Sequence, residues 1–272
     1  MAENTFYDSM VERNIGMVTE SEQKKLKDSC VAIFGAGGLG GVAAEVICRS
    51  GVGRIKIIDY SEFEPSNLNR QIFCFRSTIG QRKIDAAEIF LKDINPDLKL
   101  DKYPHDNERT MGDILKGVDV AILAVDEARA CILISREARE RNIPMVEGWA
   151  VPFFMVRVYT KNTISMEEAY DLPSKGKKLE DLTKEDLNKI RVGMFMSLQS
   201  MEGTQKFYTE EVISRIMRNK NSTFAPFVWQ NAVDMSLEAI KVLLGWGQIA
   251  LAPKFALYDP LERRIPRQFV QK

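Results

Sequence analysis

The segment Gly35-Ala36-Gly37-Gly38-Leu39-Gly40 decides the fold. It follows the apolar run Cys30–Phe34, which predicts a buried strand, and it precedes residues 42–50, whose apolar positions recur at helical spacing. A second apolar run over 54–59 predicts the next strand. Together these segments predict a β–turn–α–β unit of roughly 30 residues.

The glycines of this turn fit the pattern G-x-G-x-x-G in the strand-to-helix context that the pattern needs. Such a turn lets the backbone approach phosphate groups, and the helix that follows offers N–H donors to them. Asp59 ends the next strand, where a carboxylate can accept hydrogen bonds from ribose hydroxyls. The pattern predicts an adenine nucleotide without separating NAD from ATP. The alternative is a turn that serves only helix–strand packing.

Strands and helices go on alternating along the chain. This alternation predicts an α/β, Rossmann-like, doubly wound and mostly parallel sheet with helices on both faces. The expected strands are 98–103, 118–125, one opening at 144–146, 153–159 and 254–258, and the expected helices are 81–94, 127–141 and 226–244.

The whole chain, 1–272, is expected to form one domain. Residues 1–29 are polar and predict a partly helical N-terminal segment. Residues 161–222 are rich in charge, and we expect them to form a helical insertion in the second half, because so short and charged a segment buries little core by itself.

Composition excludes several classes of function. The chain has 272 residues, with 38 Lys+Arg, 38 Asp+Glu and a single His. A formal net charge of zero argues against bulk nucleic-acid binding and against a polybasic membrane surface. The first residues lack an apolar stretch, and no run of 18 apolar residues occurs, so we expect no signal peptide, no membrane span and a cytoplasmic location.

Two cations and a carboxylate favour nucleotidyl transfer over hydride transfer. Arg70 lies in the run 66–71 and Lys83 in the run 80–83. Cations stabilise the charge that develops on phosphoryl oxygens during transfer. Asp126 ends an apolar strand, where α/β sheets bind ligands and where a carboxylate can hold Mg²⁺. The alternative for Arg70 and Lys83 is two solvated surface cations.

With these residues in place, the sequence resembles the ThiF/MoeB/HesA family of ubiquitin-activating-enzyme-like adenylyltransferases. The resemblance covers nearly the whole chain except about 161–222, and it includes Asn95-Pro96, Ala225-Pro226 and Tyr258-Asp259. It implies ATP·Mg-dependent adenylation of a carboxylate, usually the C-terminal glycine of a ubiquitin-like or sulfur-carrier protein, with release of pyrophosphate. By the same resemblance Asp59 holds the ribose, Arg70 and Lys83 hold the phosphates, and Asp126 holds the metal. The expected nucleotide-binding residues are Gly35, Gly37, Gly38, Gly40, Asp59, Asn67 and Gln71.

The cysteines depart from the family pattern. Many members bind zinc through two C-x-x-C pairs, or use a catalytic cysteine, in the second half, whereas no cysteine here follows Cys131. We therefore expect no zinc and no thioester or persulfide on the enzyme. Glu127 also stands where the family commonly has Asn.

Arg13 lies in a segment that resembles the Arg-Gln-Ile stretch near the start of family members, with Asn14 in place of Gln. In that family the arginine reaches the ATP phosphates of the partner subunit. The resemblance implies a homodimer in which Arg13 joins Arg70, Lys83 and Asp126 as a catalytic residue. The alternative is a solvated arginine on a loose terminus.

Other functions remain open at this point. The activated carboxylate could belong to a small molecule, a peptide or a tRNA, followed by cyclisation or dehydration, because direct attack on an adenylate needs no enzyme thiol. A nicotinamide-dependent oxidoreductase and a non-catalytic nucleotide-binding scaffold are further alternatives. Trp149 ends a strand near where a substrate tail would approach, although packing is the simpler interpretation.

Overall fold

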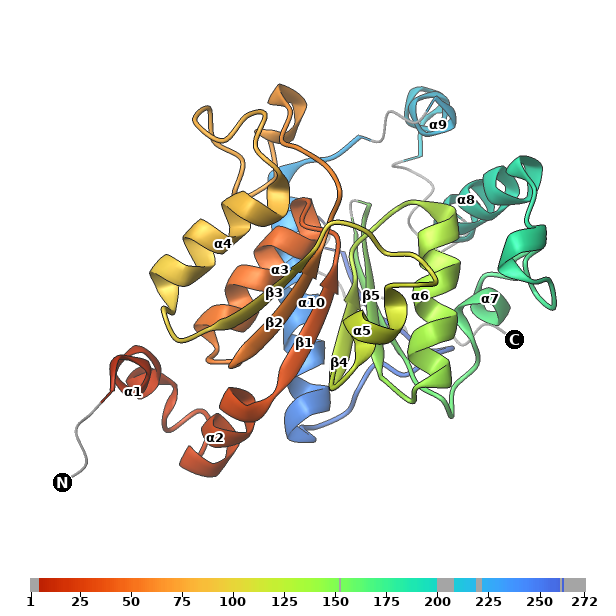
Figure 1. The fold of residues 1–272 in the computed structure, drawn as a ribbon. Coiled ribbons are helices and arrows are strands. Elements are labelled where there is room, and N and C mark those ends of the chain that lie inside the picture. The colour runs from red at the N-terminus through yellow and green to blue at the C-terminus, as the bar shows by residue number, and fades with distance from the viewer. Residues whose placement is uncertain (1–4, 152, 200–207, 219–221, 260, 262–272) are drawn as a thin grey trace.

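The computed structural model describes residues 5–151, 153–199, 208–218, 222–259 and 261. Their strands form one mostly parallel sheet. The strands are β1 (Cys30–Phe34), β2 (Arg54–Ile58), β3 (Lys99–Tyr103), β4 (Val120–Leu123), β5 (Met145–Val151), β6 (Phe153–Tyr159) and β7 (Ala256–Tyr258). Their order across the sheet is β3-β2-β1-β4-β5-β6-β7, with the first five parallel and the last two antiparallel to their neighbours (Figure 1).

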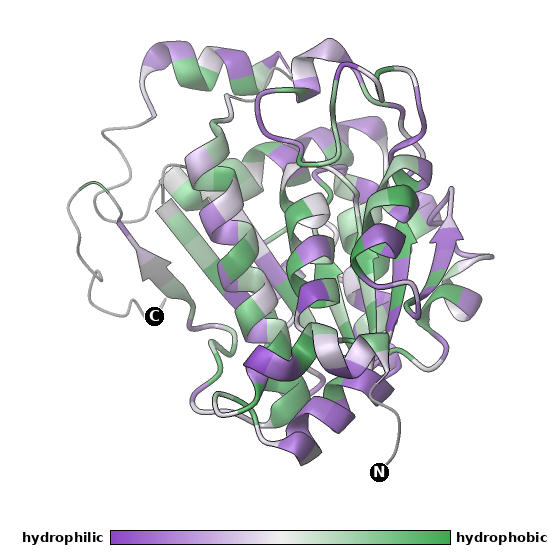
Figure 2. Cartoon of the chain, turned by 90° about the vertical axis from the view of Figure 1, so that its left-hand side faces the viewer, coloured by the Kyte–Doolittle hydropathy of each residue, from purple (hydrophilic) through white to green (hydrophobic). Residues whose placement is uncertain are grey.

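Helices cover both faces of the sheet, as the alternating pattern predicts (Figure 1). One hydrophobic cluster joins the sheet to α3, α4 and α10, and a second joins its other face to α5, α6, α7 and α8. The helices are α1 (Phe6–Val11), α2 (Glu20–Asp28), α3 (Gly38–Arg49), α4 (Lys83–Ile94), α5 (Met111–Leu115), α6 (Ala128–Glu140), α7 (Met166–Ala169), α8 (Lys184–Gln199), α9 (Glu210–Met217) and α10 (Ala225–Leu244), with 3₁₀ turns η1 (Glu12–Asn14), η2 (Pro65–Asn67) and η3 (Leu179–Asp181). Figure 2 shows polar residues concentrated on the outward sides of the helices. No described helix is long and apolar enough to cross a bilayer.

The strand order places a crevice between β1 and β4. The chain passes from β1 to β2 and β3 in one direction, and then returns to the other side of β1 as β4. Phe34 at the end of β1 is in register with Ile58 of β2 and with Leu123 of β4. The residues that follow these three positions therefore meet at one edge of the sheet, where open α/β sheets bind their ligands.

Differences from the predicted elements are local. Helix α3 begins at Gly38, earlier than the expected start at 42, because the glycine turn itself winds into the first helical turn, with Gly41 N–H donating to Gly37 C=O at 2.9 Å. The sequence pattern does not predict helix α5, because five residues are too few to show helical periodicity. The described parts of the segment 161–222 contain α7, η3, α8 and α9, whereas residues 200–207 and 219–221 lie outside the described residues.

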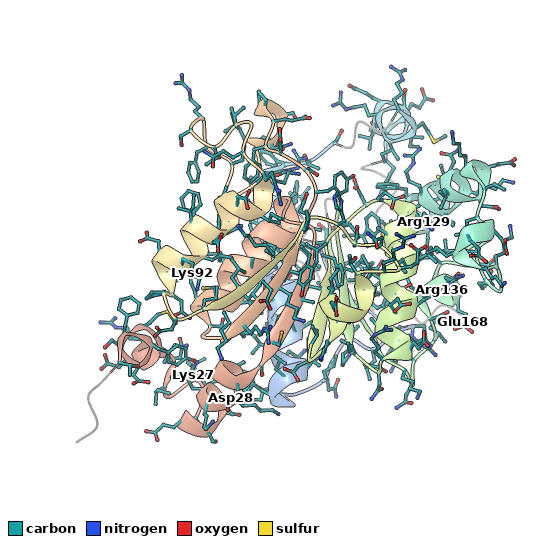
Figure 3. All side chains as sticks on the ribbon, in the orientation of Figure 1. Lys27, Asp28, Lys92, Arg129, Arg136 and Glu168 are labelled. Atoms are coloured by element: carbon teal, nitrogen blue, oxygen red, sulfur yellow. The ribbon has the colours of Figure 1, made fainter. Side chains whose placement is uncertain are left out.

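A bidentate ion pair ties this insertion to the main body. Arg136 of α6 forms a bidentate pair with Glu167 of α7, with Nη2–Oε1 at 2.7 Å and Nε–Oε2 at 2.9 Å. Arg129, the second residue of the same helix, instead pairs at 2.6 Å with Glu108 of the loop between β3 and α5, outside the insertion. Figure 3 labels both arginines on α6. Helix α6 is thus the element against which the insertion packs.

The N-terminal segment is anchored to the turn after α3. The Tyr7 hydroxyl donates to Gly51 C=O at 2.6 Å, and Gln23 Nε2 donates to the Tyr7 oxygen at 3.0 Å. Asn14 Nδ2 donates to Gln23 Oε1 at 3.0 Å. These bonds fix the described part of this segment, including η1, which carries Arg13.

Candidate nucleotide and acceptor site

A cavity of about 370 Å³ opens at the carboxyl ends of β1, β2 and β4, beside the middle of β5. It contains most of the side chains and glycines that the sequence singles out, although they come from five separate segments. The predicted residues that line it are Gly35, Gly37, Gly38, Asp59, Asn67, Arg70, Gln71, Lys83 and Asp126. Gly40 and Arg13 do not line it.

The glycines of the turn serve two different purposes. A Cβ at Gly40 would lie 1.7 Å from the Gly35 carbonyl oxygen, and a Cβ at Gly35, where φ is +100°, would lie 2.4 Å from the Ala124 oxygen. These two positions require glycine for the close packing of turn, helix and strand. Gly37 and Gly38 instead face the cavity and leave open the start of α3, where backbone N–H groups can bind phosphate oxygens.

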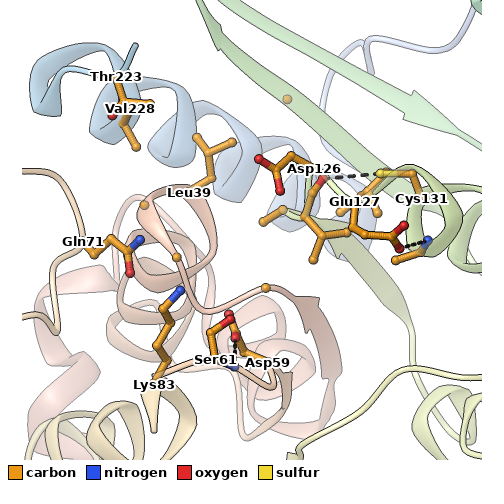
Figure 4. Close-up of a pocket in the computed structure, with 18 of the residues that line it drawn as sticks. Leu39, Asp59, Ser61, Gln71, Lys83, Asp126, Glu127, Cys131, Thr223 and Val228 are labelled. Carbon is orange, nitrogen blue, oxygen red and sulfur yellow. Dashed lines mark hydrogen bonds between the residues drawn. The ribbon is translucent and has the colours of Figure 1, made fainter. Parts of the chain in front are cut away.

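Asp59 is held rigidly beside the turn. Its Oδ2 accepts from Ala36 N–H at 2.8 Å, and its Oδ1 accepts from Ser61 N–H at 2.7 Å. Each carboxylate oxygen retains a second lone pair, which can accept a ligand hydroxyl. Figure 4 shows this carboxylate and the Lys83 side chain on the same wall of the cavity.

Lys83 and Arg70 bring positive charge to the turn from two directions. Lys83 is the first residue of α4, and its N–H donates to Ser61 C=O at 3.0 Å, which fixes the base of the side chain. Within the described residues Lys83 has no ion-pair partner. In Figure 4 its ammonium group points toward the glycine turn.

Arg70 is partly buried and held by its own loop. Its Nη1 donates to Ser66 C=O at 3.1 Å and to Asn69 Oδ1 at 2.7 Å. Burial lowers the pKa of the Arg70 guanidinium, and the nearby Asp126 carboxylate opposes that shift. A cation that has lost part of its water in this way gains from an anionic ligand.

Asn67 and Gln71 differ in how far they are already engaged. Asn67 Oδ1 accepts from Glu64 N–H at 3.1 Å, so this side chain shapes the loop from within. Gln71 is 6% exposed, and its Oε1 has no hydrogen-bond partner among the described residues. An unpaired buried amide beside a glycine turn suits a polar ligand that completes its bonding.

Asp126 and Glu127 follow β4 and behave differently. Asp126 points across the cavity from the opposite wall (Figure 4). Glu127 caps α6, accepting from Arg129 N–H at 3.0 Å and from Ala130 N–H at 2.6 Å. No described group of three or more His, Cys, Asp or Glu side chains could bind a metal by itself. One carboxylate fits Mg²⁺, which takes its remaining ligands from phosphates and water.

Sequence reasoning missed several residues of the cavity. Asp106, from the loop after β3, lines it, and burial next to the Glu127 and Asp59 carboxylates raises the pKa of this carboxyl group. Glu147 and Phe195 also line it. Nothing local in the sequence marks Phe195, because it reaches the cavity from α8, in the insertion.

Arg13 is exposed on η1, outside the cavity of its own chain. Its predicted action on a partner's phosphates is neither tested nor contradicted by a single chain, and it stays a prediction.

Comparison with known proteins places this geometry in a family. The chain is 35% identical over 140 residues to the tRNA threonylcarbamoyladenosine dehydratase of Bacillus subtilis (strain 168), a match that covers 50% of this chain and 54% of that protein. It is 33% identical over 158 residues to the ubiquitin-like modifier-activating enzyme 5 of Branchiostoma floridae, covering 53% and 38% respectively. The chain therefore spans about half or less of the length of these relatives.

A solved structure of E. coli MccB with ATP superposes with a TM-score of 0.64 at 19% identity, covering 91% of this chain and 65% of that one. At that identity the likeness shows the fold alone. The model of the ThiF family matches residues 11–272, and the chain belongs to the ThiF family.

Proposed function

We propose that the protein is an ATP·Mg-dependent adenylyltransferase that transfers AMP to a carboxylate and releases pyrophosphate. The observation that carries this proposal is that Lys83 and Arg70 line the same cavity as the glycine turn, Asp59 and Asp126. A hydride-transfer enzyme has no need of two cations at the phosphate end of its nucleotide. Family membership and the names of the relatives support the same class of reaction.

Each residue of the cavity has its own role in the proposed reaction. Asp59 accepts from the ribose hydroxyls, and the start of α3 binds phosphate oxygens. A carboxylate oxygen of the acceptor attacks the α-phosphorus, and the bond to the β-phosphate oxygen breaks. Negative charge then grows on the departing pyrophosphate, where Lys83 and Arg70 stabilise it more strongly in the transition state than in bound ATP. Asp126 would hold Mg²⁺, which neutralises phosphate charge when bound.

We infer that no enzyme thiol takes part. All four cysteines are buried, and burial raises the pKa of the Cys131 thiol, which lines the cavity, well above its usual value. A thiol held protonated is a poor nucleophile. The acceptor's adenylate would therefore pass directly to its next nucleophile.

The acceptor we favour is the C-terminal glycine of a ubiquitin-like or sulfur-carrier protein, as the name of one relative suggests. The second candidate is a carboxylate on a small molecule, peptide or tRNA, and the name of the dehydratase relative favours it.

ATP–pyrophosphate exchange tests the proposal and separates the acceptors. We expect exchange only when an acceptor is present, with Gly-Gly-tailed proteins, free peptides and threonylcarbamoylated tRNA as the three arms. The Asp59→Ala variant should bind ATP more weakly by about 1.5–3 kcal/mol, the range for hydrogen bonds to a charged group. Tight calorimetric binding of NAD with no response to ATP would overturn the proposal.

A further inference from the structure

We propose that Glu147 is a positioning residue that fixes the Trp149 indole as a wall of the cavity, and that Trp149 with Phe195 selects the group next to the activated carboxylate. This inference rests on the proposed adenylation. It concerns the side of the cavity formed by β5, α6 and α8, away from the glycine turn.

Glu147 is a buried carboxylate with an unusually full set of donors. It is 2% exposed, although it is in register with Leu123 at the carboxyl end of β4 and lines the cavity. Its Oε1 accepts from Trp149 Nε1 and from the Tyr170 hydroxyl, each at 3.0 Å, and its Oε2 accepts from the Tyr159 hydroxyl at 3.0 Å. A carboxylate so engaged is a fixed point, and it has little capacity left to bind substrate itself.

A buried cation balances this carboxylate. Arg157 is opposite Glu147 in the β5–β6 register, is 1% exposed, and brings Nη2 within 3.5 Å of Oε2. Its guanidinium carbon lies 4.7 Å from the centre of the Tyr170 ring and 5.3 Å from that of Tyr159. Burying an ion pair costs free energy that the pair's own attraction often fails to recover. We infer that this buried ion pair serves to orient the Trp149 indole.

Trp149 is the member of this network that reaches the cavity. It follows Glu147 by two residues, so both side chains leave β5 on the same face. Its ring centre lies 5.3 Å from that of Phe195, at an interplanar angle of 70°, and both residues line the cavity. Phe195 belongs to α8, so the insertion contributes directly to this wall.

The chemistry of this wall defines what it accepts. The described lining residues from β5, α6 and α8 include no Lys or Arg, and Asp126 and Glu127 add negative charge beside them. The charge of Glu147 is balanced by Arg157. A cavity of about 370 Å³ is also at the small end of ligand sites, which run to roughly 1,000 Å³. With a nucleotide bound, the space beside the aromatic pair suits a compact, uncharged group and disfavours an acidic or bulky one.

Stable mimics of the adenylate test this without knowledge of the natural acceptor. The probes are 5′-sulfamoyladenosine, which lacks an acyl group, and its N-glycyl, N-leucyl and N-aspartyl derivatives, titrated by calorimetry. We expect the wild type to bind the glycyl compound at least about tenfold more tightly than the leucyl and aspartyl compounds, a difference of about 1.4 kcal/mol.

Three variants locate the source of that preference. Trp149→Ala should reduce the leucyl-to-glycyl ratio of Kd to within about threefold, while the Kd of 5′-sulfamoyladenosine stays within about twofold of wild type. Glu147→Gln and Trp149→Phe, which weaken or remove the indole–carboxylate bond, should reduce the same ratio partially. The matched control is Trp246→Phe, which removes an indole bond of 2.6 Å to Glu22 outside the cavity and should change no ratio.

The outcomes are distinct. A wild type without preference among the acyl groups, or Trp149 variants that keep the full preference, would overturn the inference while leaving adenylation intact. Failure of the wild type to bind 5′-sulfamoyladenosine at all would instead overturn the proposed function on which the inference rests. If Glu147→Gln fails to fold, Trp149→Phe still decides the role of the bond.

Discussion

At the scale of single residues, Lys83 is the side chain on which the proposed chemistry depends most. It starts a helix, faces the glycine turn, and has no ion-pair partner among the described residues. Removing one preorganised charge from a developing transition state typically lowers kcat by about 10²–10³-fold. We expect Lys83→Ala to do so in pyrophosphate exchange, with a much smaller change in KM for ATP.

The neighbouring arginine provides a matched control for Lys83→Ala. Arg82 is exposed and pairs with Asp85 at 3.5 Å, so Arg82→Ala removes a cation of the same sign one residue away without touching the cavity. The rate of ATP–pyrophosphate exchange by Arg82→Ala should stay near that of wild type. Equal losses in both variants would indicate a general effect of charge and not a phosphate contact by Lys83.

The cysteines give a second prediction at this scale. Burial raises the pKa of Cys30 to about 11 and that of Cys48 to about 12, so both thiols stay protonated at pH 8. Iodoacetamide reacts with the thiolate form of cysteine, so it should label the folded protein slowly. After denaturation it should label all four cysteines. The same pKa values are raised in the folded state relative to the unfolded state. The free energy of unfolding should therefore fall as the pH rises above 9. Rapid labelling of one thiol in the folded protein would contradict the thiol-free route.

At the level of secondary-structure elements, the β1–α3 turn and the start of α3 contain glycines that differ in how closely their surroundings pack. Gly40 and Gly41 are adjacent in α3, yet an added Cβ would lie 1.7 Å from Gly35 O at the first and no closer than 3.4 Å to its neighbours at the second. Gly40→Ala should therefore lower Tm and abolish ATP binding. Gly41→Ala should be tolerated, since alanine favours a helix by up to about 1 kcal/mol relative to glycine. Thermal melts with and without ATP check both, and equal tolerance would refute the packing argument.

This turn also shows what local sequence can predict. The glycines, the apolar strands around them and the residues that end those strands are near in sequence or follow a regular alternation, so β1, α3, β2, Asp59 and Asp126 could be assigned in advance. Phe195 and Glu147 could not. Their place in the cavity depends on how the insertion packs on α6 and on which face of β5 meets it, and neither is encoded by short-range spacing.

At the scale of the whole molecule, the anchored N-terminal segment bears on assembly. Tyr7 and Asn14 fix the chain on either side of Arg13, so the arginine is presented from an ordered surface and not from a loose end. A guanidinium that lies outside its own cavity can act on phosphates only if another chain receives it. We therefore predict a homodimer in which Arg13 completes the partner's site.

Subunit mixing tests that prediction. Arg13→Ala and Lys83→Ala homodimers should each be nearly inactive, and their heterodimer should regain one site that carries both wild-type groups. We expect the mixture to approach one quarter of wild-type exchange, because about half the dimers are mixed and each has one intact site of two. A monomer at working concentration, or a mixture that stays inactive after verified exchange, would rule out action across the interface.

The proposed chemistry requires that this cavity direct a carboxylate to the α-phosphorus of ATP. Product analysis under single-turnover conditions, with an acceptor that supports exchange and ATP labelled in the α- and γ-phosphates, tests this most directly. We expect the α-label in the acyl adenylate or in AMP released from it, and the γ-label in pyrophosphate. The Lys83→Ala variant should form neither labelled product. Formation of ADP and inorganic phosphate, or turnover unaffected by Lys83→Ala, would contradict it.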